Sequence, residues 1–310
     1  MHIPDGMLDT KTWVSSWIGS AGALAYASAQ VRKQLQDNKV VLMAVLAALV
    51  FALQMLNFPV AGGTSGHFAG GAAVAIILGP WPAMIVMTAV LAIQALLFAD
   101  GGITALGANV VNMAIVGPLI GWLVYRSVIA ISKSRLTRTI GSFAAAWAAC
   151  VGGSLSAAVM LWISGRVPLL MGAAAMGLWH SLIGVGEGAI TAGLVTYLAT
   201  VRPDLLADET SSDARPSRQV AVALGMVALV AAGLSFLASA RPDGLEFVYG
   251  QLGRPFEGAT LLNSPMPEYA FPGLANETLA GVLAGVVGVV VCGAVVYALV
   301  RAARAGREDA

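Results

Sequence analysis

Residues 81–99 read WPAMIVMTAVLAIQALLFA, a stretch without a single charged side chain, and this stretch decides the class of fold. A helix needs about 20 predominantly apolar residues to cross the hydrocarbon core of a bilayer. The whole chain has a matching composition, because 58% of its 310 residues are hydrophobic and 11% are charged. Soluble domains carry about 25% charged residues. We therefore expect an all-α polytopic membrane protein.

Other stretches of the chain have the same character. Seven more are long and apolar enough to cross: 13–31, 40–58, 103–132, 139–163, 168–200, 220–240 and 278–300. A shorter one, 68–79, ends at Gly79-Pro80-Trp81-Pro82, where two prolines break any helix. Arg and Lys favour cytoplasmic loops, and their clusters fall on one side only if the short stretch also crosses. The pattern predicts nine membrane crossings, with the N-terminus outside and the C-terminus inside.

The polar segment 201–219, VRPDLLADETSSDARPSRQ, divides the chain. A charged, proline-containing stretch of this kind is typical of a domain junction, here on the cytoplasmic side. It separates residues 1–200, with seven crossings, from residues 220–310, a helical hairpin around the external loop 241–277. That loop is rich in Pro and Gly and shows little helix or strand periodicity. Its position alone suggests a role in opening or loading a site at the outer mouth.

Several classes of function find no support in the composition or the motifs. The net charge of +1 gives no indication of a nucleic-acid partner. Both cysteines, Cys150 and Cys292, lie in apolar runs and are interpreted as packing residues. There is no H-E-x-x-H metalloprotease motif and no G-x-x-x-x-G-K-[ST] phosphate-binding loop. We expect a protein that is not an enzyme, with any ATP hydrolysis performed by other subunits.

The first two residues, Met1 and His2, form a metal-binding pattern. The Met1 amine, the His2 backbone amide and the His2 ring Nδ1 follow one another, so that a metal would close a five-membered and a six-membered chelate ring. One further imidazole would complete a square of four nitrogens, a geometry typical of Ni(II) or Cu(II). We expect Met1 to be retained, because an initiator methionine is normally removed only before small residues.

His67 is the candidate for the fourth nitrogen. The predicted topology places it on the same side as Met1, and the twelve residues to Gly79 rise roughly 18 Å as a helix, so His67 would lie below the outer surface. Residues 1–8 would have to fold back into the protein to reach it, and Pro4-Asp5-Gly6 is a turn signal that allows this. The alternative is an unattached tail and an ordinary loop histidine.

Five polar residues at or inside spans are candidates for a supporting or path role: Asp100, Asn109, Asn112, His180 and Glu187. The two asparagines are able to bond a ligand imidazole or to join helices. His180 and Glu187 are seven residues apart and share a helix face, either as a stop on the metal path or as a structural pair. Asp100 is interpreted as a cation attractor or a solvated helix cap.

Ala21, Ala25 and Ala29 repeat every four residues along one face of the first span. Small residues at this spacing let another helix approach closely. The stripe predicts a docking face, either for a helix of this chain or for a partner.

Four motifs of the first 200 residues resemble the NikM/CbiM family, the substrate-binding membrane components of energy-coupling-factor transporters for nickel and cobalt. They are MHIPDGMLD (1–9), SGHFAGG (65–71), LGAN (106–109) and HSLIGVGE (180–187). RPDGLE (241–246) resembles the small PDGLE-type N component, so the chain is similar to a fused M–N protein. The resemblance implies a metal bound by the terminal amine, the His2 amide and ring, and the His67 ring. It also implies a transmembrane T component and a pair of cytoplasmic ATPases as partners, and a location in a prokaryotic cytoplasmic membrane.

The resemblance leaves the transported metal open. A planar four-nitrogen field with a deprotonated amide suits Ni(II), so we expect high-affinity nickel uptake. Cobalt(II) uptake by the same mechanism is the alternative, and a metal permease that needs no ATPase is another.

Overall fold

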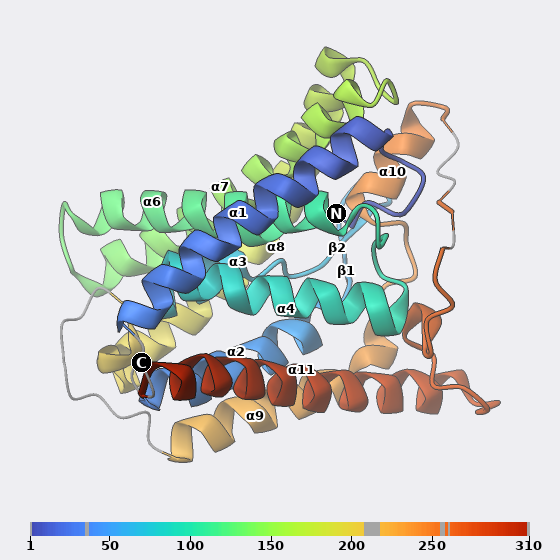
Figure 1. Ribbon diagram of the computed structural model, residues 1–310. Coiled ribbons are helices and arrows are strands. Elements are labelled where there is room, and N and C mark those ends of the chain that lie inside the picture. The colour runs from blue at the N-terminus through green and yellow to red at the C-terminus, as the bar shows by residue number, and fades with distance from the viewer. Residues whose placement is uncertain (1, 35–36, 208–217, 255–257, 260, 309–310) are drawn as a thin grey trace.

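The computed structural model describes residues 2–34, 37–207, 218–254, 258–259 and 261–308, and most of these residues are helical (Figure 1). The first half of the chain contributes α1 (Thr10–Gln34), α2 (Asp37–Gln54), α3 (Gly71–Leu78), α4 (Pro80–Phe98), α5 (Leu106–Asn109), α6 (Gly117–Ile129), α7 (Arg135–Ile163) and α8 (Leu169–Val201). The second half contributes α9 (Arg218–Gly233), α10 (Gly244–Gln251) and α11 (Glu277–Glu308). Each stretch predicted to cross therefore contains a helix.

The predicted break before residue 81 separates two helices. α3 ends at Leu78, and Pro80 and Pro82 occupy the first turn of α4, where a missing N–H costs no hydrogen bond. All eight residues of α3 are buried, and its length is about 12 Å. α3 is therefore a buried half-helix that is too short to cross the membrane by itself.

Five helices of the described residues are long and apolar enough to cross a membrane: Pro80–Phe98, Leu106–Ile129, Arg135–Ile163, Leu169–Val201 and Glu277–Arg304. The second of these joins α5 to α6 through a π-helical segment, Val110–Val116, labelled η1. Lys39–Gln54 and Ala221–Gly233 are shorter apolar helices. The chain is thus a multi-pass membrane protein, while nine crossings and the sidedness of the termini stay predictions.

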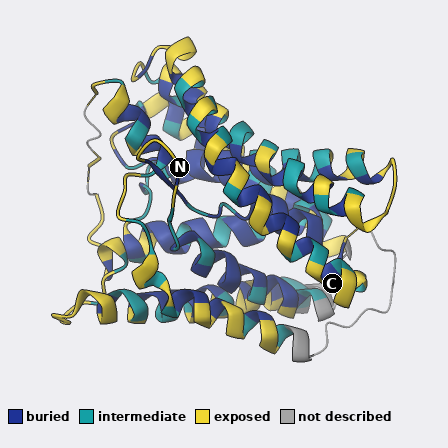
Figure 2. Cartoon of the chain, turned by 180° about the vertical axis from the view of Figure 1, so that it is seen from behind, coloured by how far each residue is buried: buried dark blue, intermediate teal, exposed yellow. Residues whose placement is uncertain are grey.

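The two halves of the chain pack against each other. α7 lies along α8 and α6, whereas α9 and α11 of the second half pack on α2 of the first (Figure 1). The residues between these helices are buried and the outer faces are exposed (Figure 2). Helix α2 thereby joins the first half of the chain to the C-terminal hairpin of α9 and α11.

The loop 241–277 differs from its expectation, because it contains α10. Asp243 begins this helix: its Oδ1 accepts the N–H of Leu245 at 2.8 Å and that of Glu246 at 2.9 Å, and Glu246 Oε2 accepts the Asp243 N–H at 3.2 Å. This reciprocal capping box stabilises both partners' backbone groups. A helix of two turns is too short to produce visible periodicity, so only the D-x-x-E spacing indicated it.

Candidate metal site

The N-terminal segment folds back into the protein. Gly6 has a φ of 83°, a left-handed conformation that glycine adopts without strain, and the chain reverses there. Ile3 is fully buried and Met7 is 3% exposed. Residues 2–8 therefore form an inserted segment, in agreement with the turn predicted at Pro4-Asp5-Gly6.

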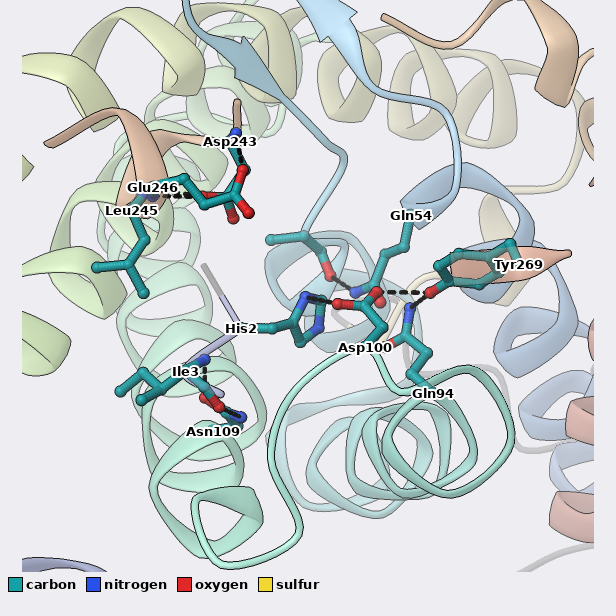
Figure 3. A network of polar contacts seen from close by, with 11 residues as sticks. His2, Ile3, Gln54, Gln94, Asp100, Asn109, Asp243, Leu245, Glu246 and Tyr269 are labelled. Carbon is teal, nitrogen blue, oxygen red and sulfur yellow. Dashed lines mark hydrogen bonds and ion pairs between the residues drawn. The ribbon is translucent and has the colours of Figure 1, made fainter. Parts of the chain in front are cut away.

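Asn109 fixes the inserted segment one residue after His2. Its Oδ1 accepts the N–H of Ile3 at 2.9 Å, and its Nδ2 donates to the Ile3 carbonyl at 3.0 Å (Figure 3). The same carbonyl accepts the N–H of Gly102 at 2.9 Å. In place of the predicted bond to a ligand imidazole, Asn109 therefore holds the backbone of the inserted segment at Ile3.

Asp5 attaches the segment to the start of the 106–129 span. Its carboxylate accepts the backbone N–H of Ile103 at 3.0 Å and that of Thr104 at 2.7 Å. A Cβ atom on Gly102 would lie 2.2 Å from the Asp5 nitrogen, so only glycine permits this approach. These contacts hold the backbone at Asp5 against the residues that precede this span.

The inserted segment brings His2 to His67. Their rings are stacked, with centroids 5.3 Å apart and planes at 16°. The His2 side chain is 8% exposed, and its Nε2 has no hydrogen-bond partner among the described residues. The predicted Met1 amine ligand lies outside the described residues. The structure therefore brings together the two predicted imidazoles.

The environment of His67 favours its neutral form. His67 lies in the loop between β2 (Ser65–Gly66) and α3, and β2 pairs with β1 (Phe58–Pro59). Burial, and to a smaller extent the nearby positive charge of His2, lower the pKa of the His67 ring to about 3. A neutral imidazole keeps a ring nitrogen lone pair for a metal.

Asp100 lies directly beside His2, a place that its expected roles as cation attractor or solvated cap did not specify. Its Oδ1 is 3.0 Å from His2 Nδ1, and its Oδ2 accepts the Tyr269 hydroxyl at 2.5 Å. Burial raises the pKa of the Asp100 carboxyl, but the charge of His2 and the hydrogen bonds from His2 and Tyr269 outweigh it and hold that pKa well below its usual range. Asp100 is therefore an ionised acceptor beside the candidate ligand His2.

A cavity of about 640 Å³ connects this region to the outside of the chain. Its lining includes both histidines together with Arg241 and four acidic residues: His2, His67, Asp100, Arg241, Asp243, Glu246, Glu268 and Tyr269. The excess of carboxylates gives the cavity a negative lining that attracts cations. It is a suitable vestibule for a divalent metal ion.

The loop 241–277 touches the site at several points. The N–H of Ser65, two residues before His67, donates to the Pro242 carbonyl at 2.9 Å. The N–H of Ala259 donates to the Asp5 carbonyl at 2.8 Å. The Tyr269 hydroxyl adds a third contact, to Asp100 at the end of α4. The C-terminal half therefore contacts the N-terminal segment, the His67 loop and the end of α4.

His180 and Glu187 lie on the buried face of α8, at 2% and 1% exposure. Together with His67 and Cys150 they line a hollow large enough for about one water molecule. His180 Nδ1 donates to the Met176 carbonyl at 2.9 Å, and Glu187 Oε1 accepts the Gly70 N–H at 3.1 Å. Each thus has a backbone partner, and Glu187 supports the loop that carries His67.

Asn112 is fully buried in η1, and neither atom of its amide has a hydrogen-bond partner among the described residues. It lines a second small hollow with Glu187. The structure places Asn112 away from the stacked imidazoles, beside the support of the His67 loop.

Ala21, Ala25 and Ala29 are exposed on α1, so the described part of the chain leaves this stripe uncovered. In the described residues no three His, Cys, Asp or Glu side chains gather closely enough to hold a metal. Tyr269 and Gln94 were missed, because nothing in their local sequence pointed to Asp100.

Two protein families together match most of the chain. A model of cobalt uptake substrate-specific transmembrane regions, CbiM, matches residues 2–205, and a PDGLE domain model matches residues 218–305. A relative from Archaeoglobus fulgidus, named as a fused nickel transport protein of the NikMN type, is 39% identical over 98% of this chain and 99% of its own. The fused nickel transport protein NikMN of Rhodobacter capsulatus is 32% identical over 93% of this chain and 94% of its own.

A solved structure agrees with these matches. The crystal structure of a transition metal transporter shares 35% sequence identity with a TM-score of 0.57, and the match covers 65% of this chain and 93% of that one. The shared region has the length of the half that carries His2 and His67.

Proposed function

We infer that this chain, which belongs to the CbiM family of cobalt uptake substrate-specific transmembrane regions and carries a fused PDGLE domain, is the metal-binding S component of an energy-coupling-factor transporter. Nickel and cobalt transport is the function of its family. The finer proposal is high-affinity uptake of Ni(II), bound as substrate in a square of four nitrogens. The ligands are the Met1 amine, the His2 amide and ring, and the His67 ring.

The stacking of His2 on His67 carries this proposal. Two imidazoles from segments 65 residues apart in the sequence meet in a partly buried place, and one of them follows the chain's first residue. Asn109 and Asp5 hold the backbone that makes this possible. A mere tail would not be hydrogen-bonded along its length, so the inserted segment supports a ligand role for the terminus.

The donor set supports nickel over cobalt. A deprotonated backbone amide is a strong in-plane donor, and square-planar nitrogen coordination is typical of Ni(II) and Cu(II). Protein ligands at all four positions leave no in-plane place for an activated water, in contrast to catalytic zinc sites. Cobalt(II) is the alternative cargo for the same site.

Energy must come from other subunits. The chain has no phosphate-binding loop motif, so a transmembrane T component and a pair of cytoplasmic ATPases are the proposed partners. The exposed stripe Ala21, Ala25 and Ala29 on α1 provides a small-residue face against which a helix of the T component packs closely.

Uptake measurements test the proposal. Cells without other nickel uptake systems are given this chain alone, or with its T component and ATPases, and accumulation of ⁶³Ni is followed with and without an ATPase-inactivating substitution. We expect accumulation only with the complete, active set. Equal accumulation by the chain alone would identify an ATPase-independent permease instead.

The loop 241–277 is proposed to assist metal entry. Gly244 packs on His180, since an added Cβ would lie 2.7 Å from that ring, and Pro242 bonds Ser65 next to the His67 loop. Comparing the rate of nickel binding before and after deletion of the loop measures this role. An unchanged rate would assign the loop to assembly instead.

A further inference from the structure

A line of polar contacts runs from the C-terminal half of the chain to the proposed ligand His2. Gln94 Nε2 on α4 donates to the Tyr269 hydroxyl at 3.2 Å, Tyr269 donates to Asp100, and Asp100 meets His2 Nδ1 at 3.0 Å (Figure 3). Gln94 lies on α4 and Asp100 lies just after that helix. Tyr269 belongs to the loop 241–277, and His2 belongs to the inserted segment. Asp100 is the junction, because its two oxygens hold residues of different segments.

Tyr269 is held rigidly for this contact. Its ring is stacked on Phe98, with centroids 4.7 Å apart and planes at 16°, and it also meets Phe51 at 6.0 Å. Glu268 and Tyr269 have φ values of 52° and 57°, a left-handed conformation that L-residues adopt only when the surroundings impose it. The backbone is thus strained at the place where the hydroxyl reaches Asp100. The contacts that Tyr269 makes there must offset the free-energy cost of this strain.

The chemistry of metal-bound histidine explains what such a contact does. A histidine that binds a metal through one ring nitrogen commonly gives its other N–H to a carboxylate, which fixes the ring and raises its donor strength. Chelation through the terminus uses Nδ1 of His2, the atom that faces Asp100 here. Metal binding through Nδ1 therefore requires a half-turn of the ring about Cβ–Cγ, which exchanges Nδ1 with Cδ2 and moves Nε2 to the present place of Cε1, on the ring edge that faces the carboxylate.

We propose that Tyr269 is a positioning residue for the metal: its hydroxyl orients Asp100, and Asp100 orients the His2 imidazole. This inference rests on the proposed function of His2 as a ligand. It makes a residue of the PDGLE half part of the support of the metal site in the other half. The competing explanation is that Tyr269 only attaches the loop to α4 by its ring.

Three variants separate these explanations: Tyr269→Phe, Asp100→Asn and the double variant. Phenylalanine keeps the stacking on Phe98 and removes only the hydroxyl. Tyr297→Phe is the matched control, because the Tyr297 hydroxyl bonds Arg301 on α11, far from the site in sequence. Nickel affinity and the visible ligand-field band of the bound metal are measured on the purified full chain with Ni²⁺ as probe, and thermal unfolding of the metal-free chain is measured alongside.

Loss of a carboxylate partner of a ligand histidine costs 10–100-fold in metal affinity. We expect Asp100→Asn to weaken nickel binding within that range and Tyr269→Phe to weaken it about tenfold. The double variant should be no weaker than Asp100→Asn alone, since Tyr269 acts only through Asp100. The ligand-field band should shift in both single variants, with Tyr297→Phe unchanged.

Other outcomes overturn the inference. Unchanged or tighter binding in Tyr269→Phe contradicts a positioning role, and so do additive effects in the double variant. A lowered melting temperature with normal affinity would show that the hydroxyl serves only loop attachment. If the unaltered chain binds no nickel, the proposed function itself fails, which is a distinguishable result.

Discussion

Both groups of the Asn109 side-chain amide form hydrogen bonds with the backbone of one residue, Ile3. The two hydrogen bonds, at 2.9 and 3.0 Å, are buried and join positions 106 residues apart. An amide is the one side chain that both donates and accepts in this arrangement. The position of His2, one residue earlier, therefore depends on the identity of Asn109.

Asn109→Asp should weaken nickel binding. A carboxylate of the same size accepts the Ile3 N–H but cannot donate to the Ile3 carbonyl, which is then buried facing a negative oxygen. The Ile3 carbonyl keeps the hydrogen bond from the Gly102 N–H but loses its second donor. Placing a buried negative oxygen against it costs about 1–3 kcal/mol, so we expect affinity to fall roughly 5- to 150-fold. Isothermal titration with Ni²⁺ measures this. The control Asn263→Asp, on an exposed loop residue, should bind as the unaltered chain does, and equal affinity of both variants would refute the argument.

One extra residue before Met1 should abolish tight nickel binding. The added residue moves the free amine out of the five-membered chelate ring, while His2 and His67 stay in place. Equilibrium dialysis gives the affinity, and the yellow band of planar low-spin nickel gives the geometry. A chain extended by one residue after Ala310 is the control. If the N-terminally extended chain binds nickel with the same band, the terminal chelate is wrong.

Gly102→Ala should dislodge the inserted segment. The new Cβ would lie 2.2 Å from the Asp5 nitrogen, a distance that backbone atoms cannot tolerate. We expect a loss of about 1–3 kcal/mol in stability, typical of overpacking, together with weaker nickel binding. Gly193→Ala is the matched control, because nothing lies within 4 Å of its Cβ position on α8. Thermal unfolding and nickel titration of both variants check the prediction, and parallel behaviour would contradict it.

The metal-free chain should lose stability in acid partly through His67. The folded pKa of this ring is lowered to about 3, against about 6.5 in an unfolded chain. Between these values the unfolded state binds a proton that the folded state does not, so stability falls as pH drops below about 6.5. Melting temperatures of the unaltered chain and of His67→Gln, measured from about pH 8 to 4.5, test this. The variant should show the smaller decrease, and equal decreases would exclude His67 as the cause.

Much of the fold was accessible to sequence patterns, because membrane spans are long runs with a single required property. The helices begin and end within several residues of the predicted spans, and the prolines at 80 and 82 correctly separated α3 from α4. The short helix α10 was missed, since eight residues give too little periodicity. Its only signal was the spacing of Asp243 and Glu246.

The candidate site also has parts that the sequence predicted and parts that it did not. The turn predicted at residues 4–6 and the side of the membrane predicted for His67 together indicated that the two imidazoles would lie close to each other. The contacts of Asp100 with Tyr269 and of Asn109 with Ile3 had no local signal, because they join residues 169 and 106 positions apart. Such pairs depend on how helices pack, which periodicity does not specify. The function of Asp100 was therefore open until its neighbours were known.

The contacts Ser65–Pro242 and Asp5–Ala259 have a consequence for the joining of the two halves in one polypeptide. Were the PDGLE half a separate subunit, each metal site would wait for a lateral encounter in the bilayer before these hydrogen bonds formed. A covalent connection makes the encounter intramolecular and fixes the stoichiometry at one loop for each site. Cutting the chain between residues 208 and 217 should then make nickel binding depend on the expression ratio of the two fragments, a dependence that the intact polypeptide avoids.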